Sequence, residues 1–391
     1  MPATKPRLLA PGPVEVAPAV LEAMARPVLH HRSPEFKALF QRVRERLAEV
    51  AMVPGEEVLV VTGSGTAGFE AGLLAIVPAG GTVVSLNAGK FGERWAHLAR
   101  RFGYRVVELE GAWGTAFDPD RVRAALRAAG HVDAVTTTHS ETSTGVLHDV
   151  EAIAAVVREE APEALMVVDA VTSLAAAELR PRAWGLDAVF SGSQKGVMVP
   201  PGLAFAYLSS RAWERSDALA AEGSLVPSYY LDLRRERERQ REGQTAATPA
   251  VSLVAGLDVS LGMLLEEGIE AVWRRRALLN EALLRAGEAV GLARYAERPS
   301  PAVAALRTPA GVAAPEVTRR LADQGIRIGA GQDAARPHLL RPSVLGYCDR
   351  FDVVTLAAAL EEAMRALGRP VAFGAGPAAA LQAMAPEAAP S

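Results

Sequence analysis

The chain has 391 residues, 50% hydrophobic and 22% charged, which is enough for two domains that share a sizeable core. Its formal net charge of −3 excludes a global basic field for binding nucleic acid. The single cysteine, Cys348, excludes an internal disulfide framework and a multi-cysteine metal site, and it fits a reducing compartment. Because the chain has neither a signal-peptide pattern nor an apolar run of bilayer length, we expect a cytoplasmic protein that binds no membrane.

Apolar segments alternate with helical segments from about Val58 to Leu208, which predicts a mainly parallel α/β sheet. The helical segments include Asp118–Ala129 and Val150–Glu159. Ligands of such sheets collect at the carboxyl ends of the strands, so functional residues are expected just after them. The seven predicted strands are Val58–Val61, Thr82–Leu86, Arg105–Leu109, Ala134–Thr138, Leu165–Val168, Ala188–Ser191 and Leu203–Leu208.

The second half of the chain predicts a solvated, highly charged helix near 231–241 and then a smaller α/β domain. Two long helices come first, over Val251–Glu267 and Ile269–Val290. The smaller unit comprises strand Val303–Leu306, helix Pro315–Gln324, strands near Ile326–Ile328 and Leu339–Arg341, and helix Phe351–Leu367. We divide the chain into an N-terminal arm (1–20), a large domain (21–258), a small domain (259–370) and a tail (371–391) that is expected to be disordered, although Ala379–Met384 could form a helical turn.

A lysine, Lys195, follows one predicted strand within Ser191-Gly-Ser-Gln-Lys-Gly196. Its amine can form an imine with an aldehyde if its pKa is depressed enough to leave it partly neutral. The alternative is a surface lysine with its ammonium in water, and for this residue alone that alternative is the better one. A second charged residue, Asp169, ends a β-branched strand. It is either a helix N-cap or an anion that keeps a pyridinium nitrogen protonated.

Glycines and hydroxyl residues form a loop after another strand, Thr62-Gly-Ser-Gly-Thr-Ala-Gly68. Such a loop at the start of a helix surrounds a phosphate with backbone amides. It is not a Walker A motif, because no Gly-Lys-Ser/Thr follows, and it is not a full dinucleotide fingerprint, because no acidic residue ends the next strand at Leu86-Asn87. A hydroxyl-rich run, His139-Ser-Glu-Thr-Ser-Thr-Gly145, follows a further strand and is either a turn or part of a site.

The combined pattern resembles the class-V aminotransferases of the fold-type-I superfamily that uses pyridoxal 5′-phosphate (PLP). The branch it is most similar to contains the alanine–glyoxylate and serine–glyoxylate (serine–pyruvate) aminotransferases. The resemblance covers about residues 8–368. It rests on Leu9-Ala-Pro-Gly-Pro13, Gly63-Ser-Gly-Thr66, Gly89-Lys-Phe-Gly-Glu-Arg94, His139-Ser-Glu-Thr-Ser-Thr-Gly145, Asp169-Ala-Val-Thr-Ser173, Ser191-Gly-Ser-Gln-Lys-Gly196 with Pro200-Pro-Gly202, and Arg341.

The resemblance implies a large domain with a mainly parallel seven-stranded sheet between helices, a smaller C-terminal α/β domain, and a homodimer with shared active sites. Lys195 would hold PLP as a Schiff base and move the proton, and Asp169 would pair with the pyridine nitrogen. Arg341 would bind the substrate carboxylate in a pocket lined by Gly12 and Thr142. The cofactor would also contact Ser64, Gly65, Thr66, Phe91, Thr142, Val171 and Gln194, with Thr245 and Thr248 reaching across from the second subunit.

The implied reaction moves an amino group from a small L-amino acid (alanine or serine) to a small 2-oxo acid (glyoxylate or pyruvate). Two departures from relatives bear on this: Thr245 stands where many have Tyr, and Pro342-Ser343 where they usually have Ile-Gly. The donor would be selected by pocket residues near His30-His-Arg32, by Ser228–Tyr230 and by the second subunit. We predict no metal site.

Four alternatives remain open. One is another class-V PLP enzyme, such as a phosphoserine or aminoethylphosphonate aminotransferase, or a lyase. A cysteine desulfurase is disfavoured because Cys348 lacks a small, flexible surround. A non-catalytic protein on an old enzyme fold is disfavoured by the joint presence of Lys195, Asp169 and Arg341. A dinucleotide-binding dehydrogenase lacks the ribose-binding acid.

Overall fold

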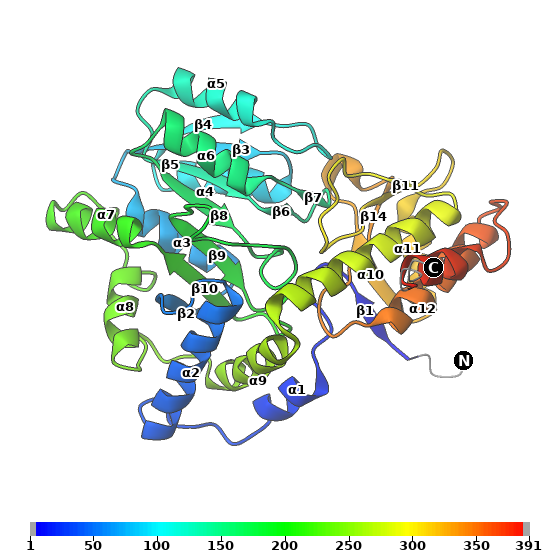
Figure 1. The fold of residues 1–391 in the computed structure, drawn as a ribbon, viewed down its shortest axis with the longest axis horizontal. Coiled ribbons are helices and arrows are strands. Elements are labelled where there is room, and N and C mark those ends of the chain that lie inside the picture. Colours follow the sequence, from blue (N-terminus) through cyan, green and yellow to red (C-terminus); the bar gives the residue numbers. More distant parts are fainter. Residues whose placement is uncertain (1–4, 386–391) are drawn as a thin grey trace, which may run out of the picture.

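The computed structural model describes residues 5–385, and its largest element is a seven-stranded sheet in the order β2-β10-β9-β8-β5-β3-β4 (Figure 1). Neighbouring strands are parallel except at β10, which is antiparallel to both β2 and β9. The strands are β2 (Val58–Thr62), β3 (Thr82–Asn87), β4 (Arg105–Glu110), β5 (Ala134–Thr138), β8 (Leu165–Asp169), β9 (Ala188–Gly192) and β10 (Leu203–Leu208). All seven predicted strands and the mainly parallel arrangement are confirmed.

Helices cover both faces of this sheet, because its strands are apolar on both faces. Val58 and Val60 join the core beneath one helical layer, whereas Leu59 and Val61 join the core beneath the other. The first layer contains α2 (Pro34–Val50), α5 (Pro119–Ala129), α6 (Val150–Glu160) and α9 (Val251–Glu267); the second contains α3 (Gly65–Ile76), α4 (Lys90–Arg101) and α7 (Ser210–Ala221). The charged run 231–241 forms α8 (Leu233–Arg241), which anchors in the second core through Leu233. Each helix within residues 5–385 is too short or too polar to span a bilayer.

A second, five-stranded sheet has its own hydrophobic core and lies beside the first (Figure 1). Its order is β1 (Arg7–Leu9), β13 (Ile326–Ala330), β14 (Leu339–Arg341), β12 (Leu306–Arg307) and β11 (Ala293–Arg294). The core under this sheet includes α11 (Ala314–Asp323) and α12 (Arg350–Ala366). Strand β1 pairs in parallel with β13, so the start of the chain belongs to the second sheet. A short hairpin, β6 (Ser140–Glu141) and β7 (Val146–Leu147), projects from the end of β5.

The change from one core to the other occurs within α10 (Ile269–Ala289). Ile269, Val272 and Trp273 pack in the core of the large sheet, whereas Leu279 and the residues after it pack under the second sheet. The core of the large sheet therefore continues beyond residue 258, after which the sequence predicted the small domain to begin. The sequence did not reveal this transition, because the amino-acid composition of α10 does not change at the point where the helix passes from one core to the other.

Two further predictions are corrected. Of the strand predicted over Val303–Leu306, only Leu306 is in a regular strand; Val303 forms an isolated bridge to Ser343 in a buried extended segment, which has the same apolar pattern. The tail predicted to be disordered contains α13 (Ala375–Ala383), whose Ala380 and Met384 are buried in the second core. Alanine favours helix, and the apolar face of α13 packs against the second core. Residues 386–391 lie outside the described part of the chain.

Helix α3 is held against the sheet by a close approach that only glycine permits. A Cβ at Gly72 would lie 2.0 Å from Cζ of Phe190, a β9 side chain that also packs against Phe69 and Trp95. This contact sets the depth of α3, and therefore the position of the Ser64-Gly-Thr66 turn at its start.

We predict that Gly72→Ala lowers the free energy of unfolding by about 1–3 kcal/mol, because the added methyl group displaces a packed ring. The matched control is Gly262→Ala in α9, where the nearest atom to a new Cβ is the flexible end of Arg46 at 3.2 Å. There the gain in helix propensity should leave stability unchanged or slightly higher. Chemical denaturation measures the free energy of unfolding of both variants. A Gly72→Ala protein as stable as the Gly262→Ala protein would contradict this account of the α3 packing.

Candidate active site

The carboxyl ends of β2, β5, β8 and β9 lie at one edge of the large sheet, since these four strands run in the same direction. Each is followed by one of the segments that the sequence singled out. The second sheet adds Arg341 from the end of β14. Just after β1, Pro11 and Gly12 reach the Lys195 side chain. The residues at this edge come from widely separated parts of the chain, and we call them the edge site.

Lys195 lies at the centre of the edge site and is only 7% exposed. Its Nζ donates a hydrogen bond to the Pro11 carbonyl and lies 6.0 Å from the centroid of the Phe91 ring. Burial, together with the nearby Arg341 guanidinium, lowers the pKa of Lys195 to about 8. Gly12 is in contact with this side chain, since a Cβ there would lie 2.5 Å from Lys195 Cε. The amine is therefore buried, and partly neutral near neutral pH.

Asp169 ends β8 and is 5% exposed. Its Oδ1 accepts a hydrogen bond from Val171 N at 2.8 Å, so the carboxylate does bind a backbone amide as an N-cap would. Burial raises the pKa of Asp169 to about 7. Among residues 5–385 it has no cationic partner within ion-pair distance. A buried carboxyl group in this condition favours a cationic ligand.

The start of α3 offers donors for an anion. Ser64 is the N-cap, its hydroxyl caps no backbone amide, and the first N–H groups of the helix have no partner within it. Arg94 Nη1 donates to Thr66 Oγ1 at 3.2 Å, and its guanidinium stacks on the Phe91 ring at 4.7 Å. The Gln194 side chain, next to Lys195, has a buried Oε1 with no hydrogen-bond partner in the described structure.

Arg341 is buried, 7% exposed, and its guanidinium is held by two carbonyl groups. Nε donates to Ala330 O and Nη1 to Thr142 O, both at 2.8 Å. Burial lowers the pKa of Arg341 to about 10, yet no carboxylate within residues 5–385 pairs with it. Its remaining N–H donors can bind the two oxygens of a carboxylate in the fork geometry of a guanidinium.

Three residues that contribute to this geometry were not predicted as site residues: Pro11, Arg94 and Glu141. Glu141 lies between the edge-site residue Thr142 and the helix that carries Phe91, and it accepts hydrogen bonds from Phe91 N and Gly92 N. An acid inside the hydroxyl-rich run 139–145 was a usable signal for Glu141. Pro11 contributes a backbone carbonyl, which no side-chain pattern reveals.

Other predicted residues are not brought to the edge site of this chain. Thr245 Oγ1 donates to Ala247 O at 2.6 Å, and Thr248 is exposed. The His30 and His31 rings face each other at 5.0 Å in the segment between α1 (Pro18–Met24) and α2, and Tyr229 is exposed to solvent. Within the described residues, none of these side chains has a hydrogen bond to an edge-site residue.

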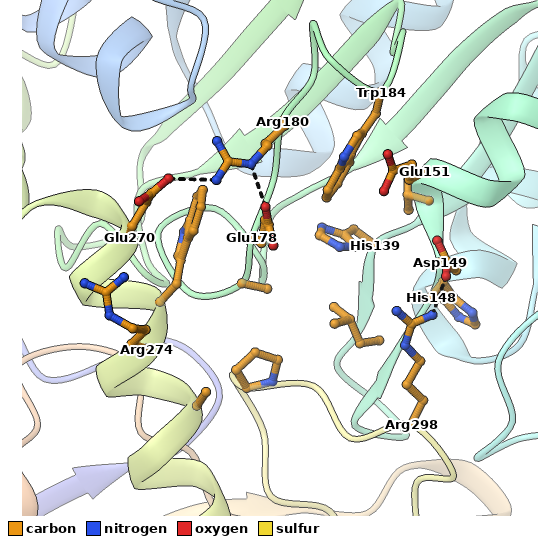
Figure 2. Close-up of a pocket in the computed structure, with 16 residues that line it drawn as sticks. His139, His148, Asp149, Glu151, Glu178, Arg180, Trp184, Glu270, Arg274 and Arg298 are labelled. Atoms are coloured by element: carbon orange, nitrogen blue, oxygen red, sulfur yellow. Dashed lines mark hydrogen bonds and ion pairs between the residues drawn. The ribbon is translucent and has the colours of Figure 1, made fainter.

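His139 faces a different cavity, of about 550 Å³, between the large sheet and the start of α10 (Figure 2). Its ring meets Trp184 edge-on at 5.8 Å, and burial lowers its pKa to about 3. His148 also lines this cavity, and burial lowers its pKa to about 4. Both rings are therefore neutral in the folded protein. The cavity contains none of the predicted site residues.

Cys348 lies outside the edge site, and its thiol is buried. Burial raises the pKa of this thiol to about 12, so the nucleophilic thiolate is not formed near neutral pH. This agrees with the low weight given to a desulfurase from the sequence.

Comparison with known proteins identifies the family. The model of the family described as "Aminotransferase class-V" matches residues 19–355. A protein named soluble hydrogenase 42 kDa subunit, from Anabaena cylindrica, is 38% identical over 95% of this chain and 97% of its own length. The serine–glyoxylate aminotransferase of Methylorubrum extorquens is 30% identical over 95% of this chain and 94% of its own.

The solved structures agree. A subgroup IV aspartate aminotransferase from Thermus thermophilus superposes with a TM-score of 0.85 at 38% identity, covering 92% of this chain and 99% of that one. The architecture is that of the PLP-dependent fold-type-I aminotransferases. The chain belongs to the class-V aminotransferases and is a PLP-dependent transaminase.

Proposed function

We propose that this enzyme transfers an amino group from alanine or serine to glyoxylate or pyruvate, with Lys195 as the lysine that binds PLP covalently. The observation that carries the proposal is a buried lysine with no carboxylate partner within the described residues, close to the similarly unpaired Asp169 and Arg341. When bound, PLP supplies an electron sink for the amino-acid substrate. The protein contributes binding, orientation and proton transfer.

The unsatisfied groups of the edge site fit the parts of PLP. The N-terminal turn of α3, with Ser64, Gly65 and Thr66, would hold the phosphate together with Gln194. Asp169 would pair with the pyridine nitrogen and so obtain the cation that its surroundings lack. Phe91 and Val171 would cover the two ring faces, and Thr142 would lie near the phenolic oxygen.

The side chains would divide the chemistry. The Lys195 amine is neutral in a large fraction of molecules near pH 8. Its Nζ would therefore accept a proton from the substrate and later give it back. The Asp169 carboxylate would keep the pyridine nitrogen protonated. Arg341 orients the substrate by its carboxylate, since two carbonyl groups already fix the guanidinium plane. Gly12 leaves room for the lysine side chain beside the substrate.

We propose a homodimer, located in the cytoplasm, in which Thr245 and Thr248 of one subunit complete the phosphate site of the other. Their lack of contact with the edge site of their own chain is compatible with this role. We also propose two domains, one around each sheet, joined by α10.

The amino donor has a second candidate, aspartate. The structural relative from Thermus thermophilus is named an aspartate aminotransferase. Arg94 is a second guanidinium near the site, and among residues 5–385 no acid lies within ion-pair distance of it. A dicarboxylate donor would present one carboxylate to each arginine. Other class-V reactions, such as phosphoserine or aminoethylphosphonate transamination, would need a site for a second anion too.

We predict that brief exposure of the apoprotein to PLP and then borohydride labels Lys195, as peptide mass spectrometry can check. Labelling should increase with pH up to about 8 and then level off, because the neutral amine reacts and burial lowers the pKa of Lys195 to about 8. Lys195→Ala should lose label, visible absorbance and turnover. Normal turnover in that variant would remove Lys195 from its role.

We predict that Arg341→Lys raises KM for the carboxylate substrates about tenfold to a hundredfold, because an ammonium group cannot form the paired contacts. Steady-state kinetics with saturating partner substrate measures the change. An exposed arginine on α11, Arg319, provides the control as Arg319→Lys, which should leave KM unchanged. An unaltered KM in Arg341→Lys would mean that another residue binds the carboxylate.

A panel of amino donors tests the substrate assignment. We expect alanine or serine to convert the bound cofactor to its amine form, followed by absorbance, and glyoxylate or pyruvate to reverse the change. If aspartate reacts faster than both, the second candidate replaces the first. In that case Arg94→Gln should slow aspartate more than it slows alanine, since both reactions use the Thr66 and Phe91 contacts of Arg94 but only aspartate presents a second carboxylate.

A further inference from the structure

We propose that Glu141 is a positioning residue, which ties the helix carrying Phe91 to the turn that holds Arg341 and so aligns the cofactor with the substrate. The proposal rests on the function proposed above for Phe91 and Arg341. It assigns a role to a fully buried carboxylate that the proposed chemistry does not use.

The first observation is that α4 has no N-terminal cap of its own. Its N-cap is Gly89, which has no side chain to satisfy the free N–H groups of the first turn. The cap comes from the β6–β7 hairpin: Ser143 Oγ accepts from Lys90 N at 3.0 Å, and Glu141 Oε2 accepts from Phe91 N at 3.1 Å and Gly92 N at 3.0 Å. The first three amides of α4 are thus bound by an element distant in sequence.

The packing explains why this cap is external. A Cβ at Gly89 would lie 2.5 Å from Glu141 Cδ and 2.5 Å from Ser143 Oγ. A capping side chain at position 89 therefore has no space while Glu141 and Ser143 occupy it. The hairpin replaces the local cap, and the position of Phe91 becomes dependent on the hairpin.

The second observation is that every partner of the Glu141 side chain is a donor. Besides the two helix amides, Ser143 N donates to Oε1 at 3.0 Å and Ser143 Oγ donates to the same oxygen. A carboxylate accepts all four bonds, and its charge is favoured at a helix N-terminus. An amide at this position would direct its NH₂ group against backbone N–H donors or toward Ser143 Oγ, which already accepts from Lys90 N, so glutamine is not an equivalent replacement here.

The third observation connects the same turn to the substrate anchor. Thr142, between the two capping residues, accepts a hydrogen bond at its carbonyl from Arg341 Nη1, and its hydroxyl bonds to Thr172 Oγ1 at 2.6 Å. The turn therefore contacts α4 on one side and Arg341 on the other. A shift of the Glu141 carboxylate moves Phe91 and Arg341 relative to each other.

The test is Glu141→Gln, and the chain offers a matched control. Glu361 is also a buried carboxylate that caps a helix from another element, accepting from Gly374 N at 2.7 Å and Gly376 N at 3.0 Å at the start of α13. We expect Glu141→Gln to raise the Kd of PLP for the apoprotein at least about tenfold, and KM for glyoxylate similarly. Glu361→Gln should lower the melting temperature and leave both constants within about twofold.

Ser143→Ala keeps the experiment decisive if Glu141→Gln fails to fold. It removes the acceptor of Lys90 N and one donor of Glu141, and retains the other bonds. We expect a smaller rise in both constants, about threefold or more, in a protein that still melts cooperatively. If both variants lose only stability, with PLP affinity and KM like those of Glu361→Gln, then Glu141 is a structural cap and the proposal fails.

The outcome is separable from that of the proposed function. Failure of Lys195 to be labelled in the wild type would overturn the assignment of the edge site itself. Normal labelling of Lys195, together with unchanged constants in Glu141→Gln and Ser143→Ala, would overturn only the positioning role.

Discussion

Three charged groups are buried at one edge of a sheet without protein ion-pair partners, and this constraint organises the rest of the structure. Lys195, Asp169 and Arg341 each pair with nothing of opposite charge within ion-pair distance in the described residues. Burying such groups is unfavourable unless a ligand compensates them. Their pKa shifts have a common cause, since burial lowers those of Lys195 and Arg341 and raises that of Asp169. The fold holds groups that a cofactor and a carboxylate substrate can satisfy.

Both sheets are needed to assemble this arrangement. The large sheet contributes Lys195 and Asp169 at the ends of adjacent parallel strands. The second sheet contributes Arg341, and β1 of that sheet leads into Pro11 and Gly12, which contact the lysine. Helix α10 joins the two cores as one continuous element. Relative movement of the sheets would therefore change the distance between Lys195 and Arg341.

The hairpin after β5 connects these parts. Its Glu141 and Ser143 cap α4, and the Thr142 carbonyl accepts from Arg341, so one short turn contacts both the helix that carries Phe91 and the second sheet. The histidine that starts the same segment has a different environment. His139 is neutral, faces a separate cavity and packs against Trp184. Residues of one sequence motif, His139 and the run 141–143, therefore lie in two different environments.

The sequence by itself determined the seven strands of the large sheet, because β-branched apolar runs between turn residues are a local signal. It also placed Lys195, Asp169, Ser64 and Thr142 after strand ends. Only the tertiary structure decided which of these meet Arg341, since that depends on how α10 orients the second sheet. The same holds for the core boundary inside α10, the packed helix α13 and the buried segment near Val303, whose apolar patterns do not specify a partner. The Pro11 carbonyl was invisible because a backbone acceptor leaves no pattern in side-chain chemistry. The external cap of α4 uses the side chains of Glu141 and Ser143, and only the tertiary structure shows that they meet the first amides of a helix distant in sequence.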